Sequence, residues 1–233
     1  MYSYNERVSY SRVDENLELN YFGLVNYMQD CSCFHSEDVG VGLSFLTPRM
    51  LGWFVVNYEI HVIRMPRYSE RIVISTYPYE VKGMMAHRIY TISAEDGTLL
   101  VYADSLWVLM NLSAGRPARI TEEMKTAYAD SGQLPQLEFE GGKLHAAQDA
   151  AEVGTFTVSE MYIDTNGHMN NSRYIDATSR FLPEPDFTSI RIDYKKPAQL
   201  NDELTVSLAQ IEGGYQILLS KDDAIYTIVE YKK

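Results

Sequence analysis

The residues best suited to chemistry lie in one run of eight, Asp-Thr-Asn-Gly-His-Met-Asn-Asn, at positions 164–171. Hydrolysis of an acyl bond requires activated water or a carboxylate as nucleophile, a group that transfers protons, and N–H donors that stabilise an oxyanion. Asp164 offers the carboxylate, Asn166 an amide and His168 an imidazole. Because a helical pattern follows the run, the unpaired N–H groups of a helix start lie close by. The run therefore holds the groups that acyl hydrolysis needs.

A second interpretation of this run is structural, because Asp, Asn and Gly before a helix commonly serve only to cap the helix and turn the chain. The residue types alone leave both interpretations open. A metal site is disfavoured, since one imidazole and one nearby carboxylate supply too few ligands. Cys31 and Cys33 are the only cysteines, and their spacing suits neither a zinc cluster nor a disulfide framework. We expect no metal, no cofactor, and thiols packed on a helix.

The run has an internal counterpart at positions 14–20, Asp-Glu-Asn-Leu-Glu-Leu-Asn, which matches positions 164–170 at the first Asp, the first Asn and the last Asn. An internal repeat predicts repeated structural units. The first copy has Glu18 where the second has His168. We therefore expect two related units, of which only the second carries the reactive set.

Each copy leads into a helical pattern and then into strand patterns. The first predicted helix buries Tyr21, Leu24, Val25 and Met28, while the second is capped by Asn170 or Asn171, buries Tyr174, Ile175, Thr178 and Phe181, and stops at Pro183. Alternating apolar residues predict strands at 54–62, 72–76, 86–93 and 99–110, and again at 190–194, 204–208, 215–220 and 224–231. A hairpin turn is predicted at 95–98, where Asp and Gly are adjacent.

A helix followed by antiparallel strands, occurring twice, predicts an α+β fold. We place an N-terminal unit at 1–112, a linker at 113–151 and a C-terminal unit at 152–233. The linker is rich in Ala, Gly, Gln and acidic residues, and its only helical pattern is a weak one at 121–129.

The composition, with 45% hydrophobic and 22% charged residues, is that of a globular protein. The sequence shows no leader pattern and no apolar stretch of membrane-spanning length, so we expect a cytoplasmic protein without membrane insertion. The net charge of −12 argues against nucleic-acid binding. An acidic protein partner would need a local basic patch. The candidates for this patch are Arg64, Arg67, Lys82, Arg88, Arg116 and Arg119.

The run at 164–171, followed by Tyr174, resembles the Asp-x-Asn-x-His-x-Asn-Asn signature of acyl-acyl carrier protein (acyl-ACP) thioesterases, the bacterial relatives of the plant enzymes that terminate fatty acyl chains. Three further segments look like landmarks of the first half of that family. They are Leu-Gly-Trp at 51–53, Met-Pro-Arg-Tyr at 65–68 and Ser-Leu-Trp-Val-Leu-Met-Asn at 105–111. The resemblance thus covers nearly the whole chain.

The resemblance implies a double hot-dog fold, in which two tandem repeats each wrap an antiparallel sheet around a long helix. It also implies hydrolysis of a fatty acyl chain from the phosphopantetheine of acyl carrier protein. Asp164 would be the catalytic carboxylate, acting on water or directly on the carbonyl. Asn166 would position Asp164 or bind the carbonyl, and His168 would transfer or orient protons.

For substrate binding, the resemblance points to Asn170 and Asn171 in the second half, and to a first half that encloses the acyl chain. Trp53, Met84, Met85 and Trp107 are the candidates to line such a tunnel, although ordinary core packing explains each of them too.

One position departs from the family pattern. Many members carry a glutamate implicated in catalysis after the strand that corresponds to 193–196, followed in plant enzymes by a cysteine, and this chain has Pro197 and Ala198 there. Either the three-residue core suffices, or a nearby acid such as Asp202 or Glu203 takes part. The departure keeps open an acyl-CoA thioesterase and a non-catalytic acyl-binding or regulatory protein. A monomer and a homodimer are both compatible with two repeats in one chain.

Overall fold

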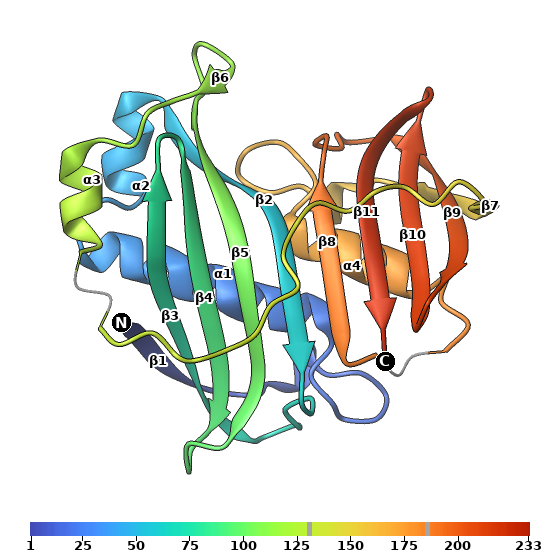
Figure 1. The fold of residues 1–233 in the computed structure, drawn as a ribbon, viewed down its shortest axis with the longest axis horizontal. Helices are drawn as coiled ribbons and strands as arrows, with labels where there is room; N and C mark the ends of the chain where they lie inside the picture. The colour runs from blue at the N-terminus through green and yellow to red at the C-terminus, as the bar shows by residue number, and fades with distance from the viewer. Residues whose placement is uncertain (130–131, 185–186) are drawn as a thin grey trace. The chain divides into compact units, whose positions relative to one another are not determined.

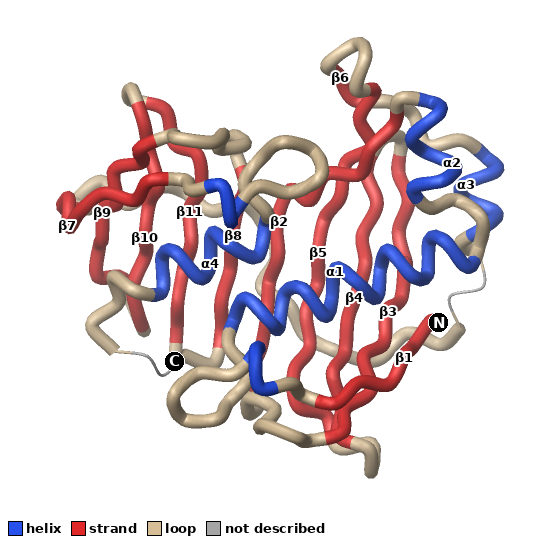
Figure 2. The backbone as a smooth tube through the Cα atoms, turned by 180° about the vertical axis from the view of Figure 1, so that it is seen from behind, coloured by secondary structure: helices blue, strands red, loops and turns tan. Residues whose placement is uncertain are grey.

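The computed structural model describes residues 1–129, 132–184 and 187–233. The chain forms two compact units, one made of Met1–Val56 with Ile63–Phe139 and the other of Asn57–Val62 with Glu140–Lys233. In each unit a helix lies across one face of an antiparallel sheet (Figures 1 and 2). This arrangement confirms the predicted α+β class and the predicted repeat.

The first unit is built around α1 (Tyr21–Asp38), with β-strands in the order β1-β3-β4-β5 and β6 paired with β5. Its other elements are β1 (Tyr2–Arg7), η1 (Tyr10–Arg12), α2 (Leu43–Leu46), η2 (Thr47–Arg49), the first part of β2 (Leu51–Val62), β3 (Arg71–Lys82), β4 (Met85–Ala94), β5 (Leu99–Asn111), β6 (Arg116–Pro117) and α3 (Glu122–Ala127).

The second unit is built around α4 (Asn171–Ser179), with strands in the order β8-β11-β10-β9-β7, and residues 57–61 of β2 pair with β8. Its other elements are β7 (Ala151–Thr157), η3 (Glu160–Tyr162), β8 (Ser189–Tyr194), β9 (Glu203–Ile211), β10 (Gly214–Lys221) and β11 (Ala224–Lys232).

Both predicted helices are confirmed, and each begins at an asparagine cap. Asn20 Oδ1 accepts a hydrogen bond from Gly23 N at 2.7 Å, and Asn170 Oδ1 accepts one from Ser172 N at 2.9 Å. The predicted apolar stripes are buried, except that Tyr21 and Phe181 are only half-buried. Phe181 lies beyond the end of α4, because the helix stops at Ser179.

All eight predicted strands are confirmed, as is the hairpin turn, in which Gly97 has a φ of +89°. The sequence did not predict α2, β1, the two-residue β6 or β7. β1 and β7 each lie at the edge of the sheet, and all of their residues are exposed or half-buried. Apolar alternation is therefore too weak in these strands to reveal them.

A pair of hydroxyl groups joins the helix to the sheet in each unit. Ser32 Oγ on α1 lies 2.7 Å from Tyr90 OH on β4, and Thr178 Oγ1 on α4 lies 2.6 Å from Tyr231 OH on β11. These groups are buried, so an unpaired hydroxyl at either place would be costly. The two contacts fix how each helix lies on its own sheet.

The segment that follows the first unit packs onto strands of the second. Buried Glu59 accepts hydrogen bonds from Glu140 N at 2.6 Å and Gly141 N at 2.9 Å. Leu144 N donates to Asp193 Oδ2 at 3.1 Å, and the Leu144 side chain packs in a small apolar cluster of the second unit. Within residues 140–147, here called the strap, four main-chain donors are satisfied by side chains of the sheet, the fourth being Ala147 N, which donates to Gln216 Oε1 at 2.7 Å.

Cys31 is buried, as expected, whereas Cys33 is exposed, which corrects the expectation that both thiols pack inside. Within the described ranges no group of three or more His, Cys, Asp or Glu side chains is placed to hold a metal. None of the helices in those ranges is long and apolar enough to cross a membrane.

We expect Tyr231→Phe to lower the free energy of unfolding by about 1 kcal/mol. It removes the buried contacts of Tyr231 OH with Thr178 Oγ1 at 2.6 Å and with Ile175 O at 3.3 Å, while Thr178 Oγ1 keeps Tyr174 O as an acceptor at 2.7 Å. Urea unfolding followed by circular dichroism measures the change. Tyr226→Phe on the same strand is the control, since the Tyr226 hydroxyl forms no hydrogen bond with a described residue. Equal losses in the two variants would contradict the role given to the Thr178–Tyr231 contact.

Candidate active site

The loop that precedes α4 is held by its own aspartate. Asp164 Oδ1 accepts hydrogen bonds from Asn166 N at 2.8 Å and, more weakly, from His168 N at 3.4 Å. Asp164 N donates to His168 O at 2.8 Å, and Gly167 N donates to Asp164 O at 3.1 Å. The loop therefore has a fixed shape that presents all three candidate catalytic side chains within five residues.

The side chains of this loop are not all joined to one another. Asp164 Oδ2 has a single long contact, 3.4 Å from Asn166 Nδ2, while Asn166 itself is exposed. His168 is half-buried, and its Nδ1 is shielded from solvent without a hydrogen-bond partner among the described residues. The structure thus brings Asp164 and Asn166 together and leaves His168 Nδ1 as a buried nitrogen without a hydrogen-bond partner among the described residues.

The counterpart loop in the first unit has the same hydrogen bonds. Asp14 Oδ1 accepts from Asn16 N at 2.9 Å and from Glu18 N at 3.0 Å, and Asp14 N donates to Glu18 O at 2.8 Å. Glu18 also forms an ion pair with Arg67 at 3.3 Å. The sequence repeat is therefore a structural repeat. At the position where the second copy has His168, the first copy has Glu18, which forms an ion pair.

The turn in each loop needs a left-handed residue. Gly167 has a φ of +77°, and Leu17, at the same place in the first loop, has a φ of +60°. Glycine adopts this conformation without strain, whereas leucine is disfavoured there. The candidate catalytic loop is consequently the less strained of the two.

The start of α4 contributes both predicted asparagines. Asn170 acts as the N-cap, since its Oδ1 also accepts from Ser172 Oγ at 2.7 Å, and its main-chain oxygen accepts from Arg173 N at 2.9 Å. Asn171 O accepts from Tyr194 OH at 2.9 Å, while Asn171 N has no acceptor among the described residues. Asn171 N is therefore a free donor at the positive end of a helix.

A turn after β8 holds the loop from the other side. Met169 N donates to Ala198 O at 2.8 Å, and Ala198 N donates to Tyr174 OH at 2.9 Å. Burial, together with the charges of Asp164 and Asp202, raises the pKa of Tyr174 to about 12, although the hydrogen bond from Ala198 N lowers it in part. Tyr174 is therefore a neutral phenol that fixes Ala198. Residue types in the sequence indicated that Tyr174 is buried but gave no signal of this bond.

Of the two acids considered as substitutes for the family glutamate, Asp202 is already engaged. Its carboxylate accepts from Gln199 N at 2.8 Å and pairs with Lys221 Nζ at 2.7 Å. Burial alone would raise the pKa of Asp202, but these two hydrogen bonds hold it below its usual value. Glu70 makes the same turn contact in the first unit, to Arg67 N at 2.8 Å. Glu203 is exposed at the start of β9.

The candidate tunnel residues of the first unit differ in their surroundings. Trp53 is half-buried against an apolar cluster, and Trp107 is half-buried with its Nε1 donating to Ser105 Oγ at 2.7 Å. Met85 is half-buried, but Met84 is exposed at the turn between β3 and β4. The expectation that Met84 lines an interior tunnel is therefore wrong.

The candidate basic patch also needs a correction. Arg88 is only 8% exposed, so the prediction that it belongs to a surface patch is wrong. Arg64 is paired with Glu70 at 2.6 Å, and Arg67 with Glu18 as described above. The remaining candidates, Lys82, Arg116 and Arg119, are exposed.

Two sequence profiles of one family match the chain. The profile of the acyl-ACP thioesterase N-terminal domain matches residues 1–128, and that of the acyl-ACP thioesterase C-terminal domain matches residues 145–229. Among curated relatives, the chloroplastic oleoyl-acyl carrier protein thioesterase 2 of Arabidopsis thaliana is 24% identical over 200 residues, which cover 77% of this chain and 54% of that protein. The chain thus spans about half the length of this relative.

Solved structures show the same fold. An acyl-ACP thioesterase from Bacteroides thetaiotaomicron superposes with a TM-score of 0.89 at 22% identity, covering 99% of this chain and 96% of that one. The 12:0-ACP thioesterase from Umbellularia californica superposes with a TM-score of 0.84 at 18% identity, again covering 99% and 96%. The double hot-dog fold expected from the sequence is thereby confirmed.

We expect Gly167→Ala to lower the free energy of unfolding by about 1 kcal/mol, because alanine is disfavoured in the left-handed backbone conformation of this position. The added Cβ would meet no atom within 4 Å, so a steric clash does not contribute. Thermal and urea unfolding measure the loss. The control is Thr165→Ala, at an exposed neighbour without a left-handed backbone. A Gly167→Ala protein as stable as the control would show that the loop is free to change shape.

Proposed function

Since the chain belongs to the acyl-ACP thioesterase family, we propose that it hydrolyses fatty acyl-ACP thioesters to free fatty acid and holo-ACP. The observation that carries the proposal is the loop at 164–168. It holds a carboxylate with one weakly bonded oxygen, an adjacent amide and an imidazole with an unpartnered nitrogen. These are the functional groups that the reaction uses.

In the proposed reaction, Asp164 takes a proton from water through Oδ2, and the water oxygen attacks the thioester carbonyl. Oδ1 is suited to holding the carboxylate in place, because it accepts the two main-chain hydrogen bonds of the loop. Asn166, whose Nδ2 lies 3.4 Å from Oδ2, orients the carboxylate or the carbonyl. A positioned carboxylate of this kind accelerates hydrolysis as a general base.

The tetrahedral intermediate then needs donors for its oxyanion and a proton for the departing thiolate. Asn171 N, the free donor at the start of α4, is our candidate for the oxyanion. His168 supplies the proton to the sulfur as the carbon–sulfur bond breaks.

We propose that three residues suffice without the family glutamate. Pro197 cannot transfer a proton, and the Asp202 carboxylate is committed to Lys221 and Gln199. The turn that contains Pro197 still contributes to the site, because Ala198 binds Met169 N directly after His168. In this chain the turn supports the loop instead of supplying an acid.

The first unit is proposed to hold the acyl chain, so that binding energy from the chain holds the thioester in place. Its apolar cluster includes Val41, Leu109 and Met124, with Trp53 packed against it. The carrier protein is the proposed partner. We further propose that the enzyme meets this soluble carrier in the cytoplasm and works as a monomer or a homodimer.

Pro197 is the observation that favours a second function, non-catalytic binding of acyl groups. A protein of this kind would keep the acyl chain site and lack turnover. Hydrolysis of acyl-CoA is the closer alternative, because it needs the same loop and differs only in the carrier of the thioester.

The repeat supplies a matched test of catalysis. We expect Asp164→Asn to lower kcat at least about a hundredfold, since asparagine keeps an acceptor oxygen for the loop but cannot act as a base. Asp14→Asn changes the same hydrogen bonds in the first unit and should leave kcat unchanged. Steady-state release of free thiol from acyl-ACP measures both. Equal effects in the two variants would rule out a specific catalytic role for Asp164.

Carrier preference is tested with acyl-ACP and acyl-CoA of matched chain length, comparing wild type with His168→Ala. We expect preferential turnover of acyl-ACP, lost in the variant, and a steeper fall with added salt for acyl-ACP than for acyl-CoA, because exposed charges that dock a protein are screened. Equal salt sensitivity would argue against docking through a basic patch. A folded wild type that hydrolyses neither substrate would favour the binding function.

A further inference from the structure

A buried cation in the first unit has no part in the proposed reaction. Arg88 lies on β4 facing α1 and is 8% exposed. Its Nη1 donates to His35 Nδ1 at 3.2 Å and to Thr76 Oγ1 at 3.3 Å. Its guanidinium carbon lies 5.3 Å from the ring centre of Tyr128. These neighbours are all uncharged.

Arg88 forms no ion pair with any carboxylate in the described ranges, where fourteen other basic-acidic contacts are found. Its Nε and Nη2 also form no hydrogen bond with a described residue. This edge of a guanidinium is one that can bind a carboxylate through two parallel hydrogen bonds. A buried charge without a counter-ion is costly, so an anion that reached this edge would be bound strongly.

His35 marks the electrostatic surroundings of Arg88. Burial and the adjacent Arg88 lower the pKa of His35 to about 4, so the imidazole is neutral and its Nδ1 accepts the hydrogen bond from Arg88. The Tyr128 hydroxyl donates a hydrogen bond to Ser36 Oγ at 2.7 Å, and Ser36 lies on α1, next to His35. The groups around the guanidinium therefore orient it without neutralising it.

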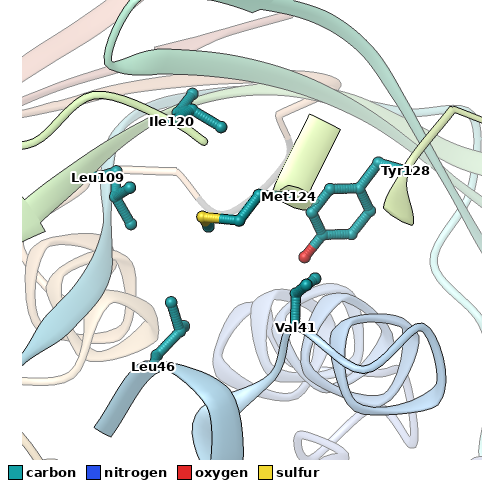
Figure 3. Close-up of a cluster of buried hydrophobic side chains, with 6 residues drawn as sticks. All are labelled: Val41, Leu46, Leu109, Ile120, Met124 and Tyr128. Carbon is teal, nitrogen blue, oxygen red and sulfur yellow. The ribbon is translucent and has the colours of Figure 1, made fainter. Parts of the chain in front are cut away.

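Next to this charge lies an apolar cluster, which indicates the kind of anion that fits. Tyr128 belongs to both, because its ring lies beside Arg88 and also packs with the cluster. Figure 3 shows these side chains converging around Met124. The cluster consists of Val41, Leu46, Leu109, Ile120, Met124 and Tyr128. A cation beside apolar side chains matches a molecule with a carboxylate at one end and a hydrocarbon chain behind it.

We propose that Arg88 is the anchor of a binding site for the carboxylate end of an aliphatic chain, with Nε and Nη2 on the carboxylate and the apolar cluster against the hydrocarbon. Two molecules carry this chemistry. One is a free fatty acid, the product of the proposed reaction, and the other is an acyl group whose far end is a second carboxylate. Assigning the site to either molecule rests on the proposed function, whereas binding of the carboxylate itself does not.

The first experiment needs no variant. Calorimetric titration of the wild-type protein at pH 8 compares decanoate with decanol, which has the same chain and an uncharged end. We expect decanoate to bind at least about tenfold more tightly, because a charge-assisted pair is gained. Equal binding, tighter binding of decanol, or no binding of either would overturn the proposal.

A variant then tests whether Arg88 causes the preference for decanoate over decanol. Arg88→Met, which keeps an unbranched side chain without the charge, should bind the two ligands equally. Arg71→Met removes an exposed arginine of the same unit and should retain the preference for decanoate. Loss of the preference in Arg71→Met but not in Arg88→Met would place the anion elsewhere and overturn the proposal.

Kinetics separate the two sources. If the ligand is the product, decanoate inhibits thioester hydrolysis competitively in wild type and at least about tenfold more weakly in Arg88→Met. If the ligand is a dicarboxylic acyl group, wild type prefers an acyl thioester that ends in a carboxylate. Its kcat/KM is then at least about tenfold higher for this substrate than for the thioester that ends in a methyl group, and Arg88→Met loses that preference. Decanoate binding without any turnover would support the site and count against the proposed function alone.

Discussion

The hydrogen bond from Met169 N to Ala198 O is the constraint on which the candidate active site depends, because it ties the reactive loop to the end of the second unit's sheet. Ala198 is in turn held by Tyr174 OH on α4. Loop, helix and turn are therefore linked in a closed set of contacts, and none can shift without the others. Preorganisation of this kind allows Asp164 and His168 to hold their places before a substrate arrives.

The two units share one loop frame but use it differently. The aspartate recurs with the same main-chain hydrogen bonds, and an asparagine caps the helix in both units, although Asn20 accepts from Gly23 N and Asn170 from Ser172 N. The positions that differ are the turn residue, Leu17 or Gly167, and the following variable residue, Glu18 or His168. Glu18 is used in an ion pair with Arg67, whereas His168 Nδ1 is left without a partner among the described residues. Few positions therefore separate the loop that carries the candidate catalytic groups from the loop that does not.

The sequence predicted the helices, the inner strands and the reactive loop, because buried stripes and caps leave a periodic signal. It did not predict β1 and β7, whose edge positions leave little apolar alternation. Arg88 was misplaced on the surface, since nothing in the local sequence distinguishes a buried arginine from an exposed one. The bond between Tyr174 OH and Ala198 N joins residues 24 positions apart, and periodicity carries no information about contacts at that range.

The strap at 140–147 has a consequence for how its sequence can vary. Four of its main-chain N–H groups donate to side chains that belong to strands, namely Glu59, Asp193 and Gln216. Every residue type except proline offers the same main-chain donor. The non-glycine positions of the strap can therefore vary in sequence, apart from Leu144, which packs in an apolar cluster. Gly141 and Gly142 are also constrained, because their φ of +65° and +77° favour glycine. The three polar anchors are constrained as well, and they lie far from the strap along the chain.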